Sequence, residues 1–218
     1  MTKTFIMTIP FQQTGKLTPV LYKAQGNTKL EYTKETRFPI IPMINGYAEE
    51  GDKIRIIAIL TDGENFRHNY ETYFVPEVSA LVECNKYSFE EIEVISTPDS
   101  EDIDTQLRLF SDVIAKIGDN EELYACITYG TKPTQIVQFM ALNYAYKLKK
   151  ETSIGGVAYG RFLHNDENGH GVGCIYDQTA LFYMNSIVNK LAEHGASNPE
   201  KAIQIMLGLD RGEETEDD

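Results

Sequence analysis

A short polar turn between an apolar run and a helical pattern is the segment of this chain best suited to chemistry. The apolar run covers residues 123–127, and Thr128, Gly130 and Lys132 separate it from a helical pattern over residues 134–149. A strand–turn–helix segment of this kind presents free backbone N–H groups and the positive end of the helix dipole to an anion. Lys132 adds a mobile positive charge. The turn therefore predicts a site for a phosphate-bearing ligand at the carboxyl edge of a parallel sheet.

The same turn also fits an ordinary strand-to-helix loop with a surface lysine, and local features do not decide between the two interpretations. Its spacing is not that of a P-loop, which argues against hydrolysis of a nucleoside triphosphate. It also lacks the GxGxxG pattern of dinucleotide-binding turns. We therefore expect neither a nicotinamide cofactor nor any other cofactor.

Polar loops follow two other strand-like runs. Residues 10–16 supply amides, a hydroxyl and a lysine, and residues 61–69 carry further polar side chains. Each loop alone also fits a solvated connection. Because ligands of open α/β sheets bind where the carboxyl ends of strands meet, three polar loops there favour a binding site. The candidate binding residues are Phe11, Gln12, Gln13, Thr14, Thr61, Asp62, Thr128, Tyr129, Gly130, Thr131, Lys132 and Pro133.

The elements that must position these loops alternate along the chain. Strand patterns cover residues 4–9, 53–60, 90–95, 123–127 and 154–159. Helical patterns cover residues 38–48, 70–82, 102–117, 134–149, 178–194 and 199–207. This alternation predicts an α/β, Rossmann-like fold, with a mostly parallel sheet flanked by helices and short helices at the C-terminal end.

Two hairpins are expected besides the parallel strands. The first is an insertion after the first strand, in which residues 17–22 pair with residues 29–33 around Gly26 and Asn27. The second has its tip in the polar, glycine-rich segment 160–173.

Length and charge limit the class of protein. The 218 residues suit one domain over residues 1–208, followed by an acidic tail, residues 209–218, that we expect to be disordered. The net charge of −13 argues against binding of duplex DNA, because such binding needs a basic face. A small phosphorylated ligand needs only a few local donors. We expect no membrane span and no secretory signal, and the sparse, odd set of three cysteines favours a reduced, cytoplasmic setting.

Other residues capable of chemistry form weaker patterns. His164, Asp166 and His170 do not have the spacing of a zinc site, and Cys174 does not complete one, so we predict no metal site. No serine or cysteine lies in a recognisable nucleophile motif. Three tyrosines near the loops are candidates to stack on a base, namely Tyr32, Tyr129 and Tyr159.

The ordered set of these features resembles the CARF (CRISPR-associated Rossmann fold) domains, in particular the branch known for a DxTHG motif. The matching segment is Cys126-Ile127-Thr128-Tyr129-Gly130, which keeps the threonine and glycine but has Cys126 and Tyr129 at the Asp and His positions. The continuation Thr131-Lys132-Pro133 is similar to a TGGTKP turn of other CARF proteins. Further similarities lie at residues 36–38, 60–62 and 157–160, so the resemblance extends over residues 3–207.

The resemblance implies a homodimeric sensor of cyclic oligoadenylate, with cyclic tetra-adenylate as the first candidate, in type III CRISPR antiviral signalling. A sensor would act on an effector partner. The alternative is a ring nuclease that cleaves the ligand without metal, through attack of a ribose 2′-hydroxyl, with Lys132, Thr128 and Gln13 as candidate catalytic residues. A further alternative is an unrelated Rossmann-like enzyme for a mononucleotide, so the question of enzymatic activity stays open at this point.

Overall fold

The computed structural model describes residues 2–85, 87–195 and 197–207. The chain divides into two compact units, Met1–Thr179 and Ala180–Asp218. One domain over residues 1–208 stays a prediction from the sequence. The predicted tail, residues 209–218, lies outside the described residues.

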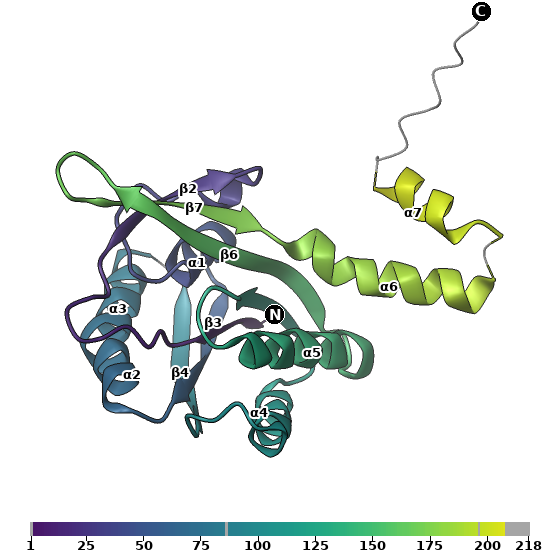
Figure 1. The fold of residues 1–218 in the computed structure, drawn as a ribbon, viewed down its shortest axis with the longest axis horizontal. Coiled ribbons are helices and arrows are strands. Elements are labelled where there is room, and N and C mark those ends of the chain that lie inside the picture. The colour runs from purple at the N-terminus through teal and green to yellow at the C-terminus, as the bar shows by residue number, and fades with distance from the viewer. Residues whose placement is uncertain (1, 86, 196, 208–218) are drawn as a thin grey trace, which may run out of the picture. The chain divides into compact units, whose positions relative to one another are not determined.

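The first unit is built on a seven-stranded sheet with the order β2-β7-β6-β5-β1-β3-β4 (Figure 1). Its strands are β1 (Thr2–Thr8), β2 (Val20–Gln25), β3 (Lys53–Thr61), β4 (Ser88–Thr97), β5 (Glu121–Cys126), β6 (Ser153–Asn165) and β7 (Gly171–Asp177). Strands β4, β3, β1, β5 and β6 are parallel to one another, with β4 at one edge of the sheet, and β7 runs antiparallel to β6. The predicted Rossmann-like α/β class is confirmed.

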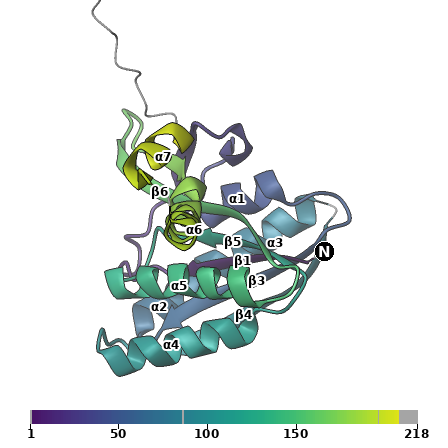
Figure 2. The same cartoon turned by 90° about the vertical axis from the view of Figure 1, so that its right-hand side faces the viewer.

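Helices cover both faces of this sheet. They are α1 (Ile40–Tyr47), α2 (Glu64–His68), α3 (Val75–Cys84), α4 (Ile103–Lys116) and α5 (Lys132–Leu148), with a 3-10 turn over Thr28–Leu30 and a π-helix over Asn69–Phe74. α4 and α5 lie side by side on one face, and α1 and α3 lie on the other (Figure 2). The predicted helix over residues 70–82 is in fact the π-helix followed by α3.

β1 lies at the centre of the sheet and is buried along almost its whole length. Apolar residues on both of its faces suit a parallel strand that is covered by helices on each side. The Phe5 ring stacks on Tyr124 of the neighbouring β5, with ring centroids 4.7 Å apart and planes 14° from parallel. This stacking fixes the register of β1 against β5. The register in turn sets the position of the loop that follows β1.

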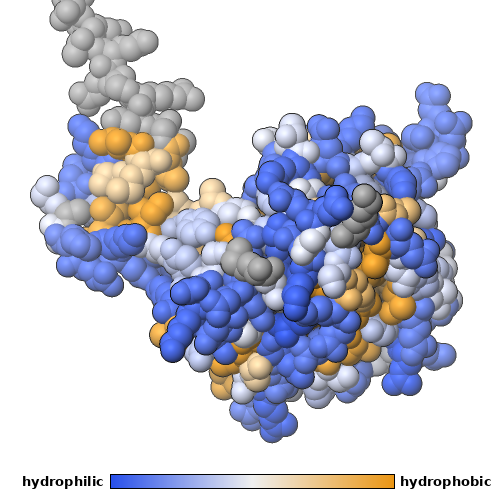
Figure 3. Space-filling model, turned by 180° about the vertical axis from the view of Figure 1, so that it is seen from behind, coloured by the Kyte–Doolittle hydropathy of each residue, from blue (hydrophilic) through white to orange (hydrophobic). Residues whose placement is uncertain are grey.

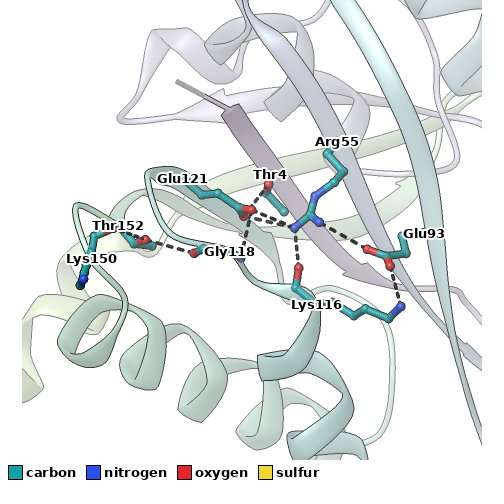
Figure 4. Close-up of polar contacts among 8 residues, drawn as sticks. All are labelled: Thr4, Arg55, Glu93, Lys116, Gly118, Glu121, Lys150 and Thr152. Carbon is teal, nitrogen blue, oxygen red and sulfur yellow. Dashed lines mark hydrogen bonds and ion pairs between the residues drawn. The ribbon is translucent and has the colours of Figure 1, made fainter.

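An ion-pair network ties the amino end of the sheet together (Figure 4). Nη2 of Arg55 on β3 donates to both carboxylate oxygens of Glu121 on β5, at 3.1 and 3.2 Å, and to the backbone oxygen of Lys116. Nη1 of Arg55 lies 3.4 Å from Glu93 on β4, and the Thr4 hydroxyl of β1 donates to Glu121 at 2.8 Å. Because Arg55 and Glu121 are largely shielded from water, each charge depends on its partner.

The predicted hairpin after β1 is wrong. β2 pairs in parallel with β7 and joins the main sheet as its edge strand. The second predicted arm contains the 3-10 turn, which begins where the Asn27 side chain accepts from the backbone N–H of Lys29 at 3.0 Å, and which buries Leu30 in the core. A two-stranded hairpin is marginal by itself, whereas the open edge of β7 offers a complete ladder.

The expected hairpin tip is shorter than residues 160–173. β6 continues to Asn165 and β7 begins at Gly171, so the tip is confined to residues 166–170. The Asp166 side chain organises this tip by accepting from the backbone N–H groups of Asn168 and His170, at 2.9 and 2.8 Å.

The second unit contains α6 (Thr179–His194, of which Thr179 belongs to the first unit) and α7 (Pro199–Met206), which confirms the expected C-terminal helices. Asn198 caps α7 by accepting from the N–H of Lys201 at 3.0 Å. Apolar residues gather on the surface of this unit (Figure 3), and Leu181, Val188 and Met206 are among its exposed side chains. Among the helices of the described residues, none is both long and apolar enough to cross a membrane.

Replacing Arg55 with alanine tests the network at the amino end of the sheet. We expect Arg55→Ala to lower the free energy of unfolding by about 3 kcal/mol, because it leaves the shielded Glu121 carboxylate without its cation. The matched control on the same strand is Lys53→Ala, which removes an exposed pair with Glu90 and should cost less than about 1 kcal/mol. Urea unfolding followed by circular dichroism measures both, and equal losses would contradict the role given to Arg55.

Candidate functional site

The carboxyl ends of β1 and β5 mark the point where the strand order of the sheet reverses. β3, which follows β2 and α1 in the chain, pairs with one edge of β1, whereas β5 pairs with its other edge and is followed in the sheet by β6. The loops that leave β1 and β5 therefore diverge toward opposite faces. In open α/β sheets a crevice forms at this reversal and is the usual place for a ligand.

A cavity of about 450 Å³ lies at this point. It is lined by Pro10, Phe11, Gln12, Thr61, Phe66, Asp99, Thr128, Tyr129, Gly130 and Thr131. Residues from all three predicted polar loops thus come together around one space. Asp99 is the acidic member of the lining, and the remaining members are neutral.

Five other predicted binding residues do not line this cavity, although each lies within two positions of a residue that does. These are Gln13, Thr14, Asp62, Lys132 and Pro133. Lys132 is exposed on the first turn of α5, where it follows the lining residue Thr131. The backbone N–H of Thr14 donates to Asn65 Oδ1 at 3.4 Å, and that of Asp62 donates to the oxygen of Thr97 at 2.8 Å.

The turn between β5 and α5 depends on Gly130. Its φ angle of 105° lies in a region that side chains rarely adopt. A Cβ at this position would also lie 3.2 Å from the Cβ of Thr8 and 3.1 Å from Nε2 of Gln135. That same Gln135 nitrogen donates to the backbone oxygen of Tyr129, which ties the turn to the helix that follows it.

Backbone donors of this turn remain available to a ligand. Among the described residues, no acceptor pairs with the N–H groups of Gly130, Thr131 or Lys132. The Thr131 hydroxyl is used within the protein, because it caps α5 by accepting from the N–H of Thr134 at 3.4 Å. Consecutive free N–H groups at the start of a 17-residue helix form a site suited to an anion.

Thr128 joins β5 to β6. Its hydroxyl accepts from the backbone N–H of Gly160 at 2.8 Å and lies 3.2 Å from the sulfur of Cys126. Burial raises the pKa of the Cys126 thiol. Cys126 therefore contributes a neutral group at the position where the CARF motif has an aspartate, and the Thr128 hydroxyl is already engaged within the protein.

Tyr129 anchors the turn to the core. Its hydroxyl donates to the backbone oxygen of Arg37 at 2.7 Å, and its ring meets Phe38 edge-on with centroids 6.5 Å apart. Burial raises the pKa of Tyr129 well above its usual value. The tyrosine at the histidine position of the motif thus has a structural role, although it still lines the cavity. Of the other two tyrosines that were candidates to stack on a base, Tyr32 lines two different cavities. Tyr159 lines a cavity that shares residues with this one.

Asn69 is an organising residue of the site that the sequence did not indicate. It is fully buried at the start of the π-helix, and its Nδ2 donates to the backbone oxygens of Pro10 and Gln12 at 2.9 and 2.8 Å. These two bonds hold the loop that carries Phe11 and Gln12 into the cavity. π-helical segments are frequent at functional sites, but an asparagine among polar neighbours carries no signal of this contact.

Metal-binding geometry is absent from the described part of the chain. No group of three or more His, Cys, Asp or Glu side chains there is placed to hold an ion. His170 at the hairpin tip instead lies with its Nδ1 2.8 Å from a Glu35 carboxylate oxygen.

Neither a known protein-family model nor a curated protein matches this chain.

Exchange of Gly130 for alanine tests the construction of the turn. We expect Gly130→Ala to cost about 3 kcal/mol of stability, because strain from the φ angle adds to crowding by Thr8 and Gln135. Gly169→Ala is the matched control: its φ of 85° is strained too, but its Cβ would meet nothing within 4 Å. It should cost about 1 kcal/mol. Thermal unfolding of both variants gives the comparison, and equal costs would show that crowding at Gly130 is unimportant.

Proposed function

We propose that this chain binds cyclic oligoadenylate as a sensor of type III CRISPR antiviral signalling, with cyclic tetra-adenylate as the first candidate ligand. The observation that carries the proposal is the cavity at the strand-order reversal, whose lining includes Gly130 and Thr131, two residues whose N–H groups have no acceptor among the described residues. A phosphate is the anion that such a turn suits best. The resemblance of residues 126–130 to the CARF motif supplies the class of ligand.

Exposed apolar side chains on α4 and α5 support the proposed homodimer. Ile103 and Leu107 on α4 are 69% and 59% exposed, and Ile136 and Met140 on α5 are 61% and 55% exposed. Both helices begin at the carboxyl edge of the sheet, where the cavity lies. A second copy of the chain that covered these residues would bring two cavities together around a two-fold axis, as a symmetric ring requires.

Binding has more support than cleavage. A metal-independent ring nuclease must hold a ribose 2′-hydroxyl in line with the neighbouring phosphate. Of the candidate catalytic residues, Gln13 and Lys132 do not line the cavity, and the Thr128 hydroxyl is engaged with Gly160. We therefore propose a sensor that acts on an effector partner, and keep ring cleavage as the alternative.

Incubation with defined ligands distinguishes the candidate functions. The full chain is mixed with cyclic tetra-adenylate, cyclic hexa-adenylate or AMP, without added metal, and the mixture is separated by size-exclusion and reversed-phase chromatography. We expect intact cyclic tetra-adenylate to elute with the protein. Linear products with 2′,3′-cyclic phosphate ends would instead identify a ring nuclease. Binding of AMP with neither ring would favour a mononucleotide enzyme and overturn the proposal.

Lys132 is the cation that directly follows the turn, and its charge should contribute to ring binding. We expect Lys132→Ala to weaken ring binding about fivefold at low salt, since an exposed cation beside the turn loses its attraction for phosphate. Lys147→Ala, an exposed lysine in the last turn of the same helix, is the control and should bind as the unaltered chain does. Circular dichroism confirms that both variants fold. Unchanged affinity of Lys132→Ala would remove this residue from the site.

A further inference from the structure

A second cavity, of about 510 Å³, adjoins the first at the carboxyl edge of the sheet. The two share Gln12, Thr128 and Tyr129 in their linings. The second cavity is also lined by Tyr159, Gly160, Arg161 and Phe162, which belong to the part of β6 that continues past its pairing with β5. A ligand that spans both cavities would contact the three residues that they share.

The charge of this second cavity differs from that of the protein as a whole. Its lining contains Lys16 and Arg161 and no aspartate or glutamate, in a chain with a net charge of −13. Neither cation forms an ion pair with any described residue. Two unpaired cations without a neighbouring carboxylate raise the local concentration of anions.

Two aromatic side chains of β6 add stacking surface. Tyr159 and Phe162 belong to the lining, and 38% and 50% of their surfaces remain exposed. Tyr159 is held in place by Tyr176 of β7, with ring centroids 6.4 Å apart and planes at 28°. Exposed aromatic rings next to cations are a common arrangement for holding a base and its phosphate.

Gln12 provides an acceptor that the protein itself does not use. Its Oε1 is buried, and no donor among the described residues reaches it. Gln12 lines both cavities, and Asn69 fixes its backbone. Buried amide oxygens normally have a partner, and the exocyclic amine of a base or a ribose hydroxyl would satisfy this one.

We propose that this second cavity is a nucleotide subsite, which takes one base and its phosphate from a ligand whose neighbouring unit occupies the first cavity. Tyr159 and Phe162 offer the stacking surface, Lys16 and Arg161 attract the phosphate, and Gln12 lies between the two units. The inference rests on the proposed function in that it takes the ligand to be an oligonucleotide.

Calorimetric titration of the full chain with cyclic tetra-adenylate tests the subsite. We expect Phe162→Ala to weaken binding about tenfold through loss of stacking, and Arg161→Gln about fivefold, with a smaller dependence of affinity on salt. The controls are Leu163→Ala, a neighbour that is 42% exposed and lines neither cavity, and Lys147→Gln. Both should stay within about twofold of the unaltered chain.

The outcomes separate the subsite from the proposed function. Ring binding that Phe162→Ala and Arg161→Gln leave unchanged would overturn the subsite and retain the sensor. If no ring binds, the sensor proposal fails, and titration with AMP then tests the subsite alone. AMP binding that Arg161→Gln weakens, with Lys147→Gln unaffected, would support the subsite. AMP binding that neither variant changes, or no AMP binding, would overturn it.

Discussion

The pairing of β1 on both of its edges is the constraint on which the rest of the structure depends. β1 is buried between β3 and β5, and stacking of Phe5 on Tyr124 holds it in register with β5. With this strand fixed, the chain must leave toward one face after β1 and toward the other after β5. The crevice between the loop after β1 and the loop after β5 is therefore a consequence of topology, and the residues of these loops form its lining.

The strands of the parallel core could be predicted because their apolar runs are long and separated by helical periodicity. The partner of β2 could not be predicted, since its pairing with β7 joins residues 20–25 to residues 171–176, which no local sequence signal connects. β7 and the end of β6 were missed for a related reason. The end of β6 is mostly exposed and polar and β7 begins with two glycines in three residues, so both resemble a loop, and hydrogen bonding along the hairpin makes them strands.

At the site, sequence showed which loops would meet but not which side chains would face the cavity. Polar residues after three strands were enough to predict that these loops meet, because parallel strands bring their carboxyl ends to one edge. The position of Gln12 depends on the buried Asn69, which donates to its backbone oxygen. The backbone conformation at Gly130 depends on Gln135, which donates to the backbone oxygen of Tyr129. The departures from the CARF motif have a structural explanation too: Cys126 contacts Thr128, and Tyr129 anchors the turn on Arg37.

The site that we propose for phosphates lies in an acidic protein, and such a site needs cations and backbone donors concentrated where the ligand binds. Native mass spectrometry of the chain with cyclic tetra-adenylate tests this account most directly, because it counts chains and ligands in one complex. The account predicts two chains with a single intact ring. One nucleotide for each chain, or two chains that retain no ring, would contradict it.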